Sequence, residues 1–136
     1  ISPLGSVYQA GTLSGNPIAV SAGLSTINEI EKHSDFYDEL ERKSAYLENA
    51  MVKSGLNVNR VGSIMTVFFS DRKIVDYDTA KTSDTKKYSE FFNHLLENGI
   101  YTAPSQFEAM FISYAHTDED IEYTADVISN KYSRIS

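Results

Sequence analysis

The sequence of 136 residues contains no cysteine, which excludes a disulfide framework and thiolate chemistry. Basic residues are also few: 12 lysines and arginines stand against 19 aspartates and glutamates, for a net charge of -7. This acidic surplus argues against nucleic acid and against an anionic membrane surface as partners. The amino end lacks a basic-then-apolar signal pattern, and no apolar run approaches the length of a membrane span. We therefore expect a cytoplasmic protein.

The rest of the composition is that of an ordinary folded domain. Apolar residues make up 41% and charged residues 23% of the chain, which is typical of a globular protein. A chain of this length buries roughly two thirds of its unfolded surface, enough for a real core. Residues Ile1–Leu4 include no initiator methionine and resemble the middle of a longer polypeptide. We therefore expect a piece of a larger protein.

Four stretches carry apolar residues at helical spacing. In the first, Val20, Leu24 and Ile27 recur every three or four residues. Thr117 and Asp120 before the last stretch resemble a capping box, with Asp in place of the usual Glu. The pattern predicts helices over 17–32, 35–53, 84–98 and 118–132. The buried face predicted for the third of them consists of Tyr88, Phe91, Phe92, Leu95 and Leu96.

Strand signals lie between these helices. The stretch 57–70 is rich in β-forming residues, and both of its faces are mostly apolar, so we expect a strand covered on both sides with a bulge or break at Gly62. Shorter strands are predicted at 100–102 and 110–115, and 71–83 is predicted to be a loop. The fold class is therefore α+β, with two layers: helices cover a three- or four-stranded, mainly antiparallel sheet.

A loop near the start is rich in small and hydroxyl residues. It runs over 8–15 and leads to Asn16, a good helix N-cap, and Pro17, which suits the first helical position. Loops of this kind bind anions, above all phosphate, through backbone N–H groups and hydroxyls. The alternative, on local composition alone, is a glycine-containing turn followed by a helix cap.

Three motifs match a known enzyme family in the right order. They are YQAGTLSGNP at 8–17, DYDTAKTSDTKKY at 76–88 and APSQFEAMFISYAHTDEDI at 103–121. Through them the chain resembles, from about Ser6 to about Tyr132, the glutamate-1-semialdehyde 2,1-aminomutases, class III aminotransferase-like enzymes of fold type I. The resemblance implies that the chain is the carboxyl-terminal portion of such an enzyme. Residues 1–33 would be the cofactor-phosphate loop and linking helix from the large domain, and 34–136 the small α+β domain.

The resemblance implies a cofactor role for the loop near the start. In this family the pair that matches Gly11 and Thr12 holds the phosphate of the cofactor, pyridoxal or pyridoxamine 5'-phosphate, in the site of the neighbouring subunit of a homodimer. Tyr8 is expected to line the same shared site. The alternative is a turn that only satisfies its own backbone.

The SQFEA motif supplies the expected catalytic residue. In the resembled family, the glutamate that matches Glu108 reaches the active site near the Schiff-base nitrogen and the substrate amine. A carboxylate beside apolar residues has its charged form disfavoured unless it finds a partner, which is how active sites tune acids. Ser105 and Gln106 are expected to shape the substrate end. The alternative for Glu108 is a solvated loop residue.

Parts of the family's site have no counterpart in this sequence. No lysine stands in the Gly-Gly-Lys context of the Schiff-base lysine, and the aspartate that protonates the pyridine ring is also missing. We therefore expect the chain alone to be inactive and not to hold the cofactor. The full enzyme would convert glutamate-1-semialdehyde, an amino-aldehyde, into 5-aminolevulinate for tetrapyrrole biosynthesis.

Two other functions stay open. One is an ω-aminotransferase of the same class, although an arginine in place of Glu108 would have favoured it. The other is a free-standing, non-catalytic α+β dimerisation module. No histidine has ligand spacing with a carboxylate partner, so we predict no metal site.

Overall fold

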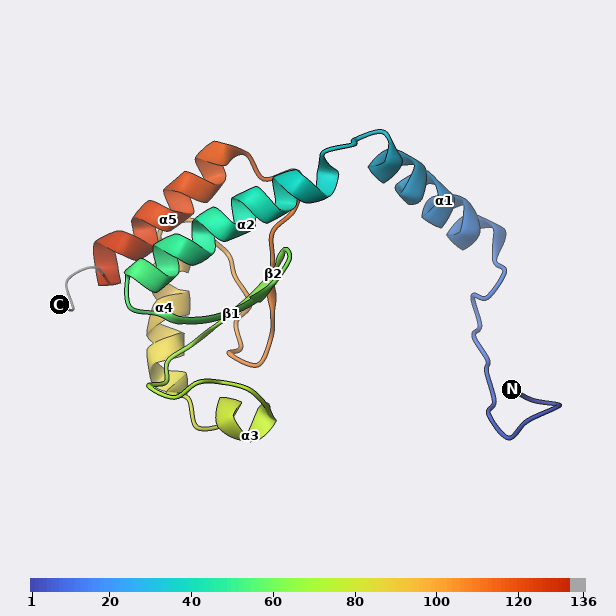
Figure 1. Ribbon diagram of the computed structural model, residues 1–136, viewed down its shortest axis with the longest axis horizontal. Helices are drawn as coiled ribbons and strands as arrows, with labels where there is room; N and C mark the ends of the chain where they lie inside the picture. Colours follow the sequence, from blue (N-terminus) through green and yellow to red (C-terminus); the bar gives the residue numbers. More distant parts are fainter. Residues whose placement is uncertain (133–136) are drawn as a thin grey trace. The chain divides into compact units, whose positions relative to one another are not determined.

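The computed structural model describes residues 1–132 (Figure 1). The chain divides into two compact units, Ile1–Phe36 and Tyr37–Ser136, and each is described by itself. The roles predicted for domains 1–33 and 34–136 within a larger enzyme stay predictions. The last four residues of the second predicted domain lie outside the described part of the chain.

The first unit contains one helix, α1 (Pro17–Glu31), which begins where the sequence predicts it. The Asn16 side chain accepts hydrogen bonds from the backbone N–H groups of Ile18 and Ala19, and Pro17 occupies the first turn. No residue of α1 is buried, so its predicted apolar stripe faces outward. The exposed side chains are those of Ile18, Val20, Leu24 and Ile27.

Three long helices belong to the second unit: α2 (Phe36–Lys53), α4 (Thr85–Glu97) and α5 (Asp118–Tyr132). All three were predicted to within one or two residues. The capping box before α5 is confirmed, because Thr117 N–H donates to Asp120 and Asp120 N–H donates back to the Thr117 hydroxyl. Within residues 1–132, no helix is long and apolar enough to cross a membrane.

The sheet has three strands, β1 (Asn57–Val61), β2 (Ile64–Phe68) and β3 (Met110–Phe111), in the order β1-β2-β3 and antiparallel throughout. The predicted α+β class is thereby confirmed. The break expected at Gly62 is confirmed, but the expectation of one strand over 57–70 is wrong, because the chain reverses between paired residues Val61 and Ile64 and forms two strands. Gly62 makes this possible, since its φ of 57° lies in the left-handed region that two-residue hairpin turns require.

The later strand predictions also need correction. Residues 100–102 form no strand, and the strand predicted at 110–115 is only two residues long. The reason for the second difference is a turn: His116 N–H donates to the Ser113 carbonyl, and Ser113 N–H donates to Nδ1 of His116. The predicted loop 71–83 contains a short helix, α3 (Tyr77–Ala80), capped by Asp76.

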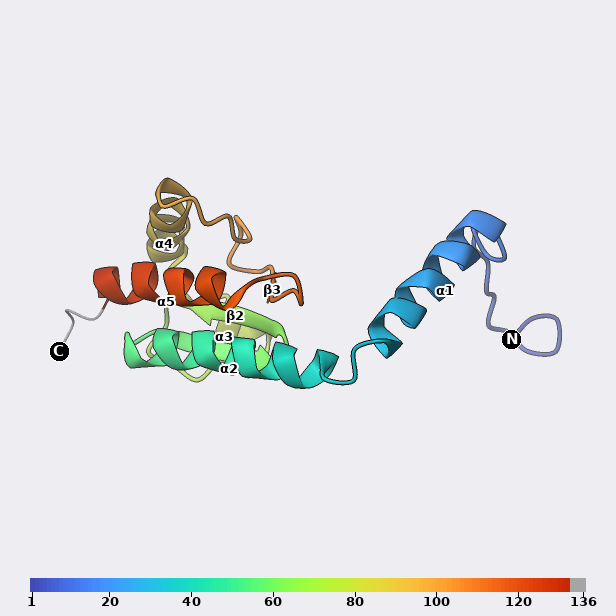
Figure 2. The same ribbon diagram turned by 90° about the horizontal axis from the view of Figure 1, so that it is seen from above.

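The two faces of the sheet are covered unequally. Met65 and Val67 point to the core side, where α2 and α5 lie side by side (Figures 1 and 2). On the other face, Phe68 packs with Ile74 and Ala80. Ile64, however, is 43% exposed, so the expectation of a strand covered along both sides is wrong for the hairpin end.

An ion-pair network joins the sheet to α2. The guanidinium of Arg60 on β1 lies 2.8 Å from the carboxylate of Glu41 and 2.7 Å from that of Glu48. The hydrogen bond from Arg60 lowers the pKa of Glu41 below its ordinary value of 4.5. Folding thus favours the charged form of this carboxylate.

We expect Phe91→Ala to destabilise the second unit by about 3–5 kcal/mol. Phe91 is fully buried, and its ring lies 5.8 Å from that of Phe69 and 6.0 Å from that of Tyr88. Urea unfolding followed by circular dichroism measures the loss. Leu96→Ala on the same helix is the control, because this side chain is 46% exposed and its truncation should cost about 0.5 kcal/mol or less. Equal losses for the two variants would contradict this description of the core.

We expect Glu41→Gln to reduce the loss of stability in acid. Because the folded-state pKa of Glu41 is lowered, its contribution is fully present above pH 4.5 and disappears as the pH falls through the lower folded value. Urea midpoints measured between pH 3 and pH 7 should therefore fall less steeply for Glu41→Gln than for the unsubstituted chain. Glu97→Gln, at an exposed position, should follow the unsubstituted chain; identical slopes for all three would argue against the ion pair.

Candidate functional site

The glycine-containing loop in the first unit consists of two successive turns. Ser14 N–H donates to the Gly11 carbonyl and Asn16 N–H donates to the Leu13 carbonyl, each over 3.0 Å. Gly15 has a φ of 75°, which allows the second turn to lead directly into α1. The local geometry of the loop therefore agrees with the turn-plus-cap interpretation.

The same loop leaves donors available. Among the residues that the structure describes, nothing accepts a hydrogen bond from the backbone amides of Gly11 and Thr12 or from the Thr12 hydroxyl, and both residues are exposed. By contrast, the first amides of α1 are already occupied by Asn16. An anion would therefore be held by the loop rather than by the helix N-terminus. Tyr8 is exposed at the start of the loop.

Gly11 is not required by the loop itself. Its φ does not lie in the left-handed region. A Cβ atom there would come within 2.5 Å of the Ser14 hydroxyl, but that oxygen can rotate away. A glycine at this position leaves the backbone open to close approach by another group.

Glu108 lies in a tight turn of the second unit. Its N–H donates to the Ser105 carbonyl over 3.1 Å, and Phe107 N–H donates to the Ser105 hydroxyl over 3.2 Å. The Phe107 ring contacts that of Tyr77, with centroids 6.2 Å apart. Glu108 is exposed, whereas Gln106 is only 2% exposed and neither polar atom of its side chain has a partner among the described residues.

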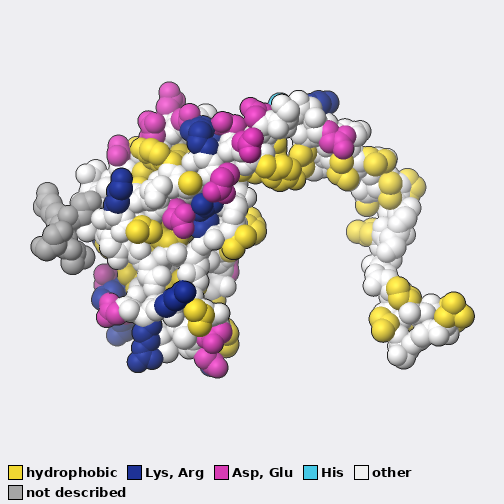
Figure 3. Space-filling view, viewed as in Figure 1, with side chains coloured by type: hydrophobic (Ala, Val, Ile, Leu, Met, Phe, Trp, Pro, Cys, Tyr) yellow, Lys and Arg dark blue, Asp and Glu magenta, His cyan; other side chains and the backbone are white. Residues whose placement is uncertain are grey.

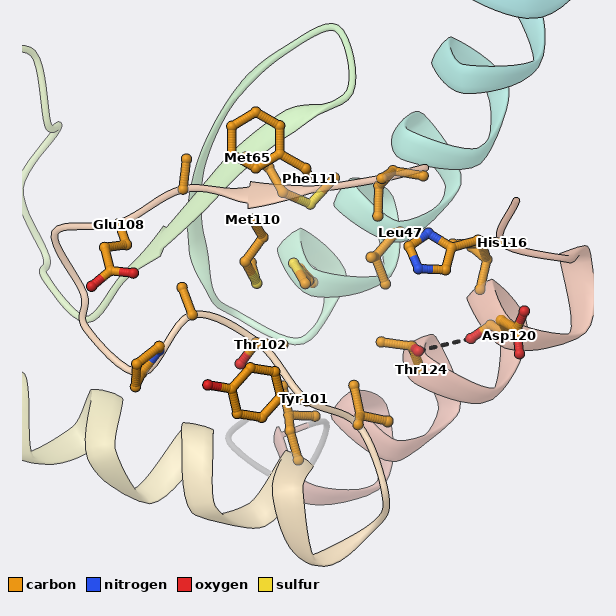
Figure 4. A pocket seen from close by; sticks show the side chains of 18 residues that line it. Leu47, Met65, Tyr101, Thr102, Glu108, Met110, Phe111, His116, Asp120 and Thr124 are labelled. Carbon is orange, nitrogen blue, oxygen red and sulfur yellow. Dashed lines mark hydrogen bonds between the residues drawn. The ribbon is translucent and has the colours of Figure 1, made fainter. Parts of the chain in front are cut away.

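A cavity of about 440 Å³ adjoins this turn (Figure 4). Glu108 lies at one end of it and His116 and Asp120 lie at the other, while the side chains between them are mostly apolar. The hydroxyl of Thr102 is buried without a hydrogen-bond partner in the described chain. The carboxylates and the imidazole that line the cavity therefore lie at its two ends, with mostly apolar side chains between them.

Tyr88 on α4 connects the Glu108 turn to the core. Its hydroxyl donates to the Ala103 carbonyl over 2.7 Å. Burial raises the pKa of Tyr88, and the negative charge of Glu108 raises it further. The sequence predicts Tyr88 on a buried helix face, but no pattern in it indicates this hydrogen bond.

The predicted site residues are divided between the two units of the chain. Tyr8, Gly11 and Thr12 lie in the first unit, and the residues of the SQFEA motif lie in the second. Within residues 1–132, no three His, Asp or Glu side chains are grouped as they would be around a metal ion.

Solved structures identify the fold. A β-phenylalanine aminotransferase from Variovorax paradoxus matches 96% of this chain and 31% of its own, with a TM-score of 0.74 and 22% sequence identity. An omega-transaminase from Sphaerobacter thermophilus matches 98% of this chain with a TM-score of 0.67 and 17% identity. The fold is therefore that of one portion of an aminotransferase.

Proteins of similar sequence narrow the assignment further than the solved structures do. No profile of a known protein family matches the chain. The protein from Chlorobaculum tepidum named glutamate-1-semialdehyde 2,1-aminomutase is 57% identical over 130 residues, which cover 91% of this chain. The protein of that name from Alkaliphilus oremlandii is 48% identical over 136 residues, or 99% of this chain. Along nearly its whole length the chain therefore matches one portion of proteins of this name, and it spans about 30% of the length of these relatives.

Proposed function

We propose that this chain is the carboxyl-terminal region of a pyridoxal-phosphate-dependent aminomutase that converts glutamate-1-semialdehyde into 5-aminolevulinate. The observation that carries the proposal is the 57% identity to a protein of that name along nearly the whole chain. The ω-aminotransferase alternative has weaker support, because the matched transaminase structures share 22% identity or less with this chain.

The glycine-containing loop fits the phosphate of the cofactor. Two amides and one hydroxyl at Gly11 and Thr12 are exposed donors, which a dianionic phosphate needs. These donors lie on the unit that would reach the neighbouring subunit's site in a homodimer. The apolar face of α1 would pack against the large domain of the enzyme. We further propose that the enzyme works in the cytoplasm.

Glu108 fits the role of a carboxylate at the reacting amine. The tight turn at Ser105 holds its backbone, and its side chain is exposed and free to face a substrate. The bound cofactor would supply the electron sink and the carrier for the amino group. Glu108 would hold or release a proton at the substrate nitrogen, and Ser105 and Gln106 would shape the same end of the site.

The proposal is tested with a chimera, in which this chain replaces the 130 homologous residues of the Chlorobaculum tepidum protein. We expect the chimera to form 5-aminolevulinate from glutamate-1-semialdehyde and Glu108→Gln to lower kcat about 100-fold or more, because the amide cannot exchange a proton. Glu97→Gln is the matched control at an exposed helix position and should leave kcat unchanged. An active Glu108→Gln chimera would remove Glu108 from the reaction. If the unsubstituted chimera is inactive but the isolated chain dimerises stably, the dimerisation module becomes the better description.

The phosphate role is tested in the same chimera by Thr12→Val. The substitution keeps the shape of the side chain and removes its hydroxyl, so we expect the Kd of pyridoxal phosphate to rise about tenfold, the cost of one hydrogen bond to a charged group. Cofactor absorbance during titration measures this change. Ser14→Ala is the control: it removes a hydroxyl of the same loop to which the proposal gives no contact with the phosphate, and it should not change the Kd. The same Kd for Thr12→Val and the unsubstituted chimera would show that the loop does not grip the phosphate.

A further inference from the structure

We propose that Tyr88 is a positioning residue, which places Glu108 by holding the backbone of the segment that leads to it. The inference rests on the proposed function, in which Glu108 acts at the substrate amine. Tyr88 itself touches no reacting atom and acts through the carbonyl of Ala103.

The segment 101–109 has few other attachments. It belongs to no strand or helix, and its other hydrogen bonds, those at Ser105, are local. Within the described chain, the bond from the Tyr88 hydroxyl is the only hydrogen bond that joins these nine residues to a different element. Beyond it, the segment has ring contacts, such as that between Phe107 and Tyr77.

Tyr88 is a rigid anchor. It is 3% exposed, and its ring lies 6.5 Å from that of Phe69 and 6.0 Å from that of Phe91. The start of α4 is tied to the end of the hairpin, because Asp84 N–H donates to the Phe69 carbonyl over 2.9 Å. A hydroxyl on this side chain therefore has one fixed position relative to the core.

The bond is close enough to Glu108 to set its position. Ala103 precedes Pro104, whose ring restricts the backbone, and the turn from Ser105 to Glu108 follows directly. With the Ala103 carbonyl fixed and β3 starting at Met110, both ends of the short loop are anchored. Without the bond, the first half of the loop has no hydrogen bond to another element of the described chain, and Glu108 samples a wider range of positions. Small displacements of this kind reduce catalysis because reacting groups lose their alignment.

The first experiment measures loop order in the chain by amide hydrogen exchange. Tyr88→Phe keeps the buried ring and removes only the hydroxyl. We expect exchange at the amides of Phe107 and Glu108 to accelerate about tenfold, the factor that corresponds to one lost hydrogen bond. Exchange at the Ile100 amide, which donates to the Leu95 carbonyl outside the segment, should not change.

Tyr123→Phe is the matched control, because the Tyr123 hydroxyl also donates to a backbone carbonyl, that of Asn98, over 3.1 Å. It should leave the amides of Phe107 and Glu108 unaffected. Unchanged exchange in Tyr88→Phe, or equal acceleration in both variants, overturns the proposal. A uniform acceleration that includes Ile100 would show general destabilisation instead of loop release, and also overturns it.

The second experiment uses the active chimera and separates positioning from a merely structural role. Tyr88→Phe should lower kcat about tenfold while KM changes less than twofold and the variant remains fully folded at the assay temperature. Tyr123→Phe should leave both kinetic constants unchanged. Equal kcat values for Tyr88→Phe and Tyr123→Phe refute the role of Tyr88. If the unsubstituted chimera is inactive, the proposed function fails on its own, and hydrogen exchange alone decides whether Tyr88 positions the loop.

Discussion

The packing of α4 against the end of β2 and against α5 is the contact on which the second unit depends. Phe91 is fully buried, and its ring contacts those of Phe69 and Tyr132. Polar bonds support this contact, because Lys131 donates to the Glu90 carbonyl over 3.0 Å. Sheet, α4 and α5 thereby form one core around a few aromatic rings, and the loop with Glu108 is attached to that core (Figure 1).

Both groups of candidate site residues lie on loops, and the two loops differ in what holds them. The loop with Gly11 and Thr12 is shaped by its own backbone bonds and exposes its donors. The loop with Glu108 is held from outside by Tyr88 and by β3. Apolar side chains remain exposed over α1, as the space-filling view shows (Figure 3), and at the hairpin end of the sheet, where Val61 and Ile64 lie. A segment that spans about 30% of its relatives is expected to expose surface that the whole enzyme covers.

Much of the fold follows from local signals. Asn16 caps α1, Thr117 and Asp120 cap α5, and helical spacing located the long helices, because these features depend on residues only a few positions apart. Gly62 signalled a break in 57–70, but not that the chain reverses there, because whether a break is a bulge or a hairpin turn depends on how the two segments pair. The strand predicted at 100–102 failed because pairing needs a partner edge at the right place, which is a long-range property.

The sequence by itself determined the α+β class and the boundaries of the four long helices, and three motifs in it indicated the family and the candidate residues Gly11, Thr12 and Glu108. Only the tertiary structure decided what those residues have around them. It showed that the donors of the first loop are free while the α1 amides are occupied, and that Gln106 is buried beside an exposed Glu108. The bond from Tyr88 to Ala103 joins residues 15 positions apart, and no local pattern encodes where a buried hydroxyl meets a carbonyl of another element.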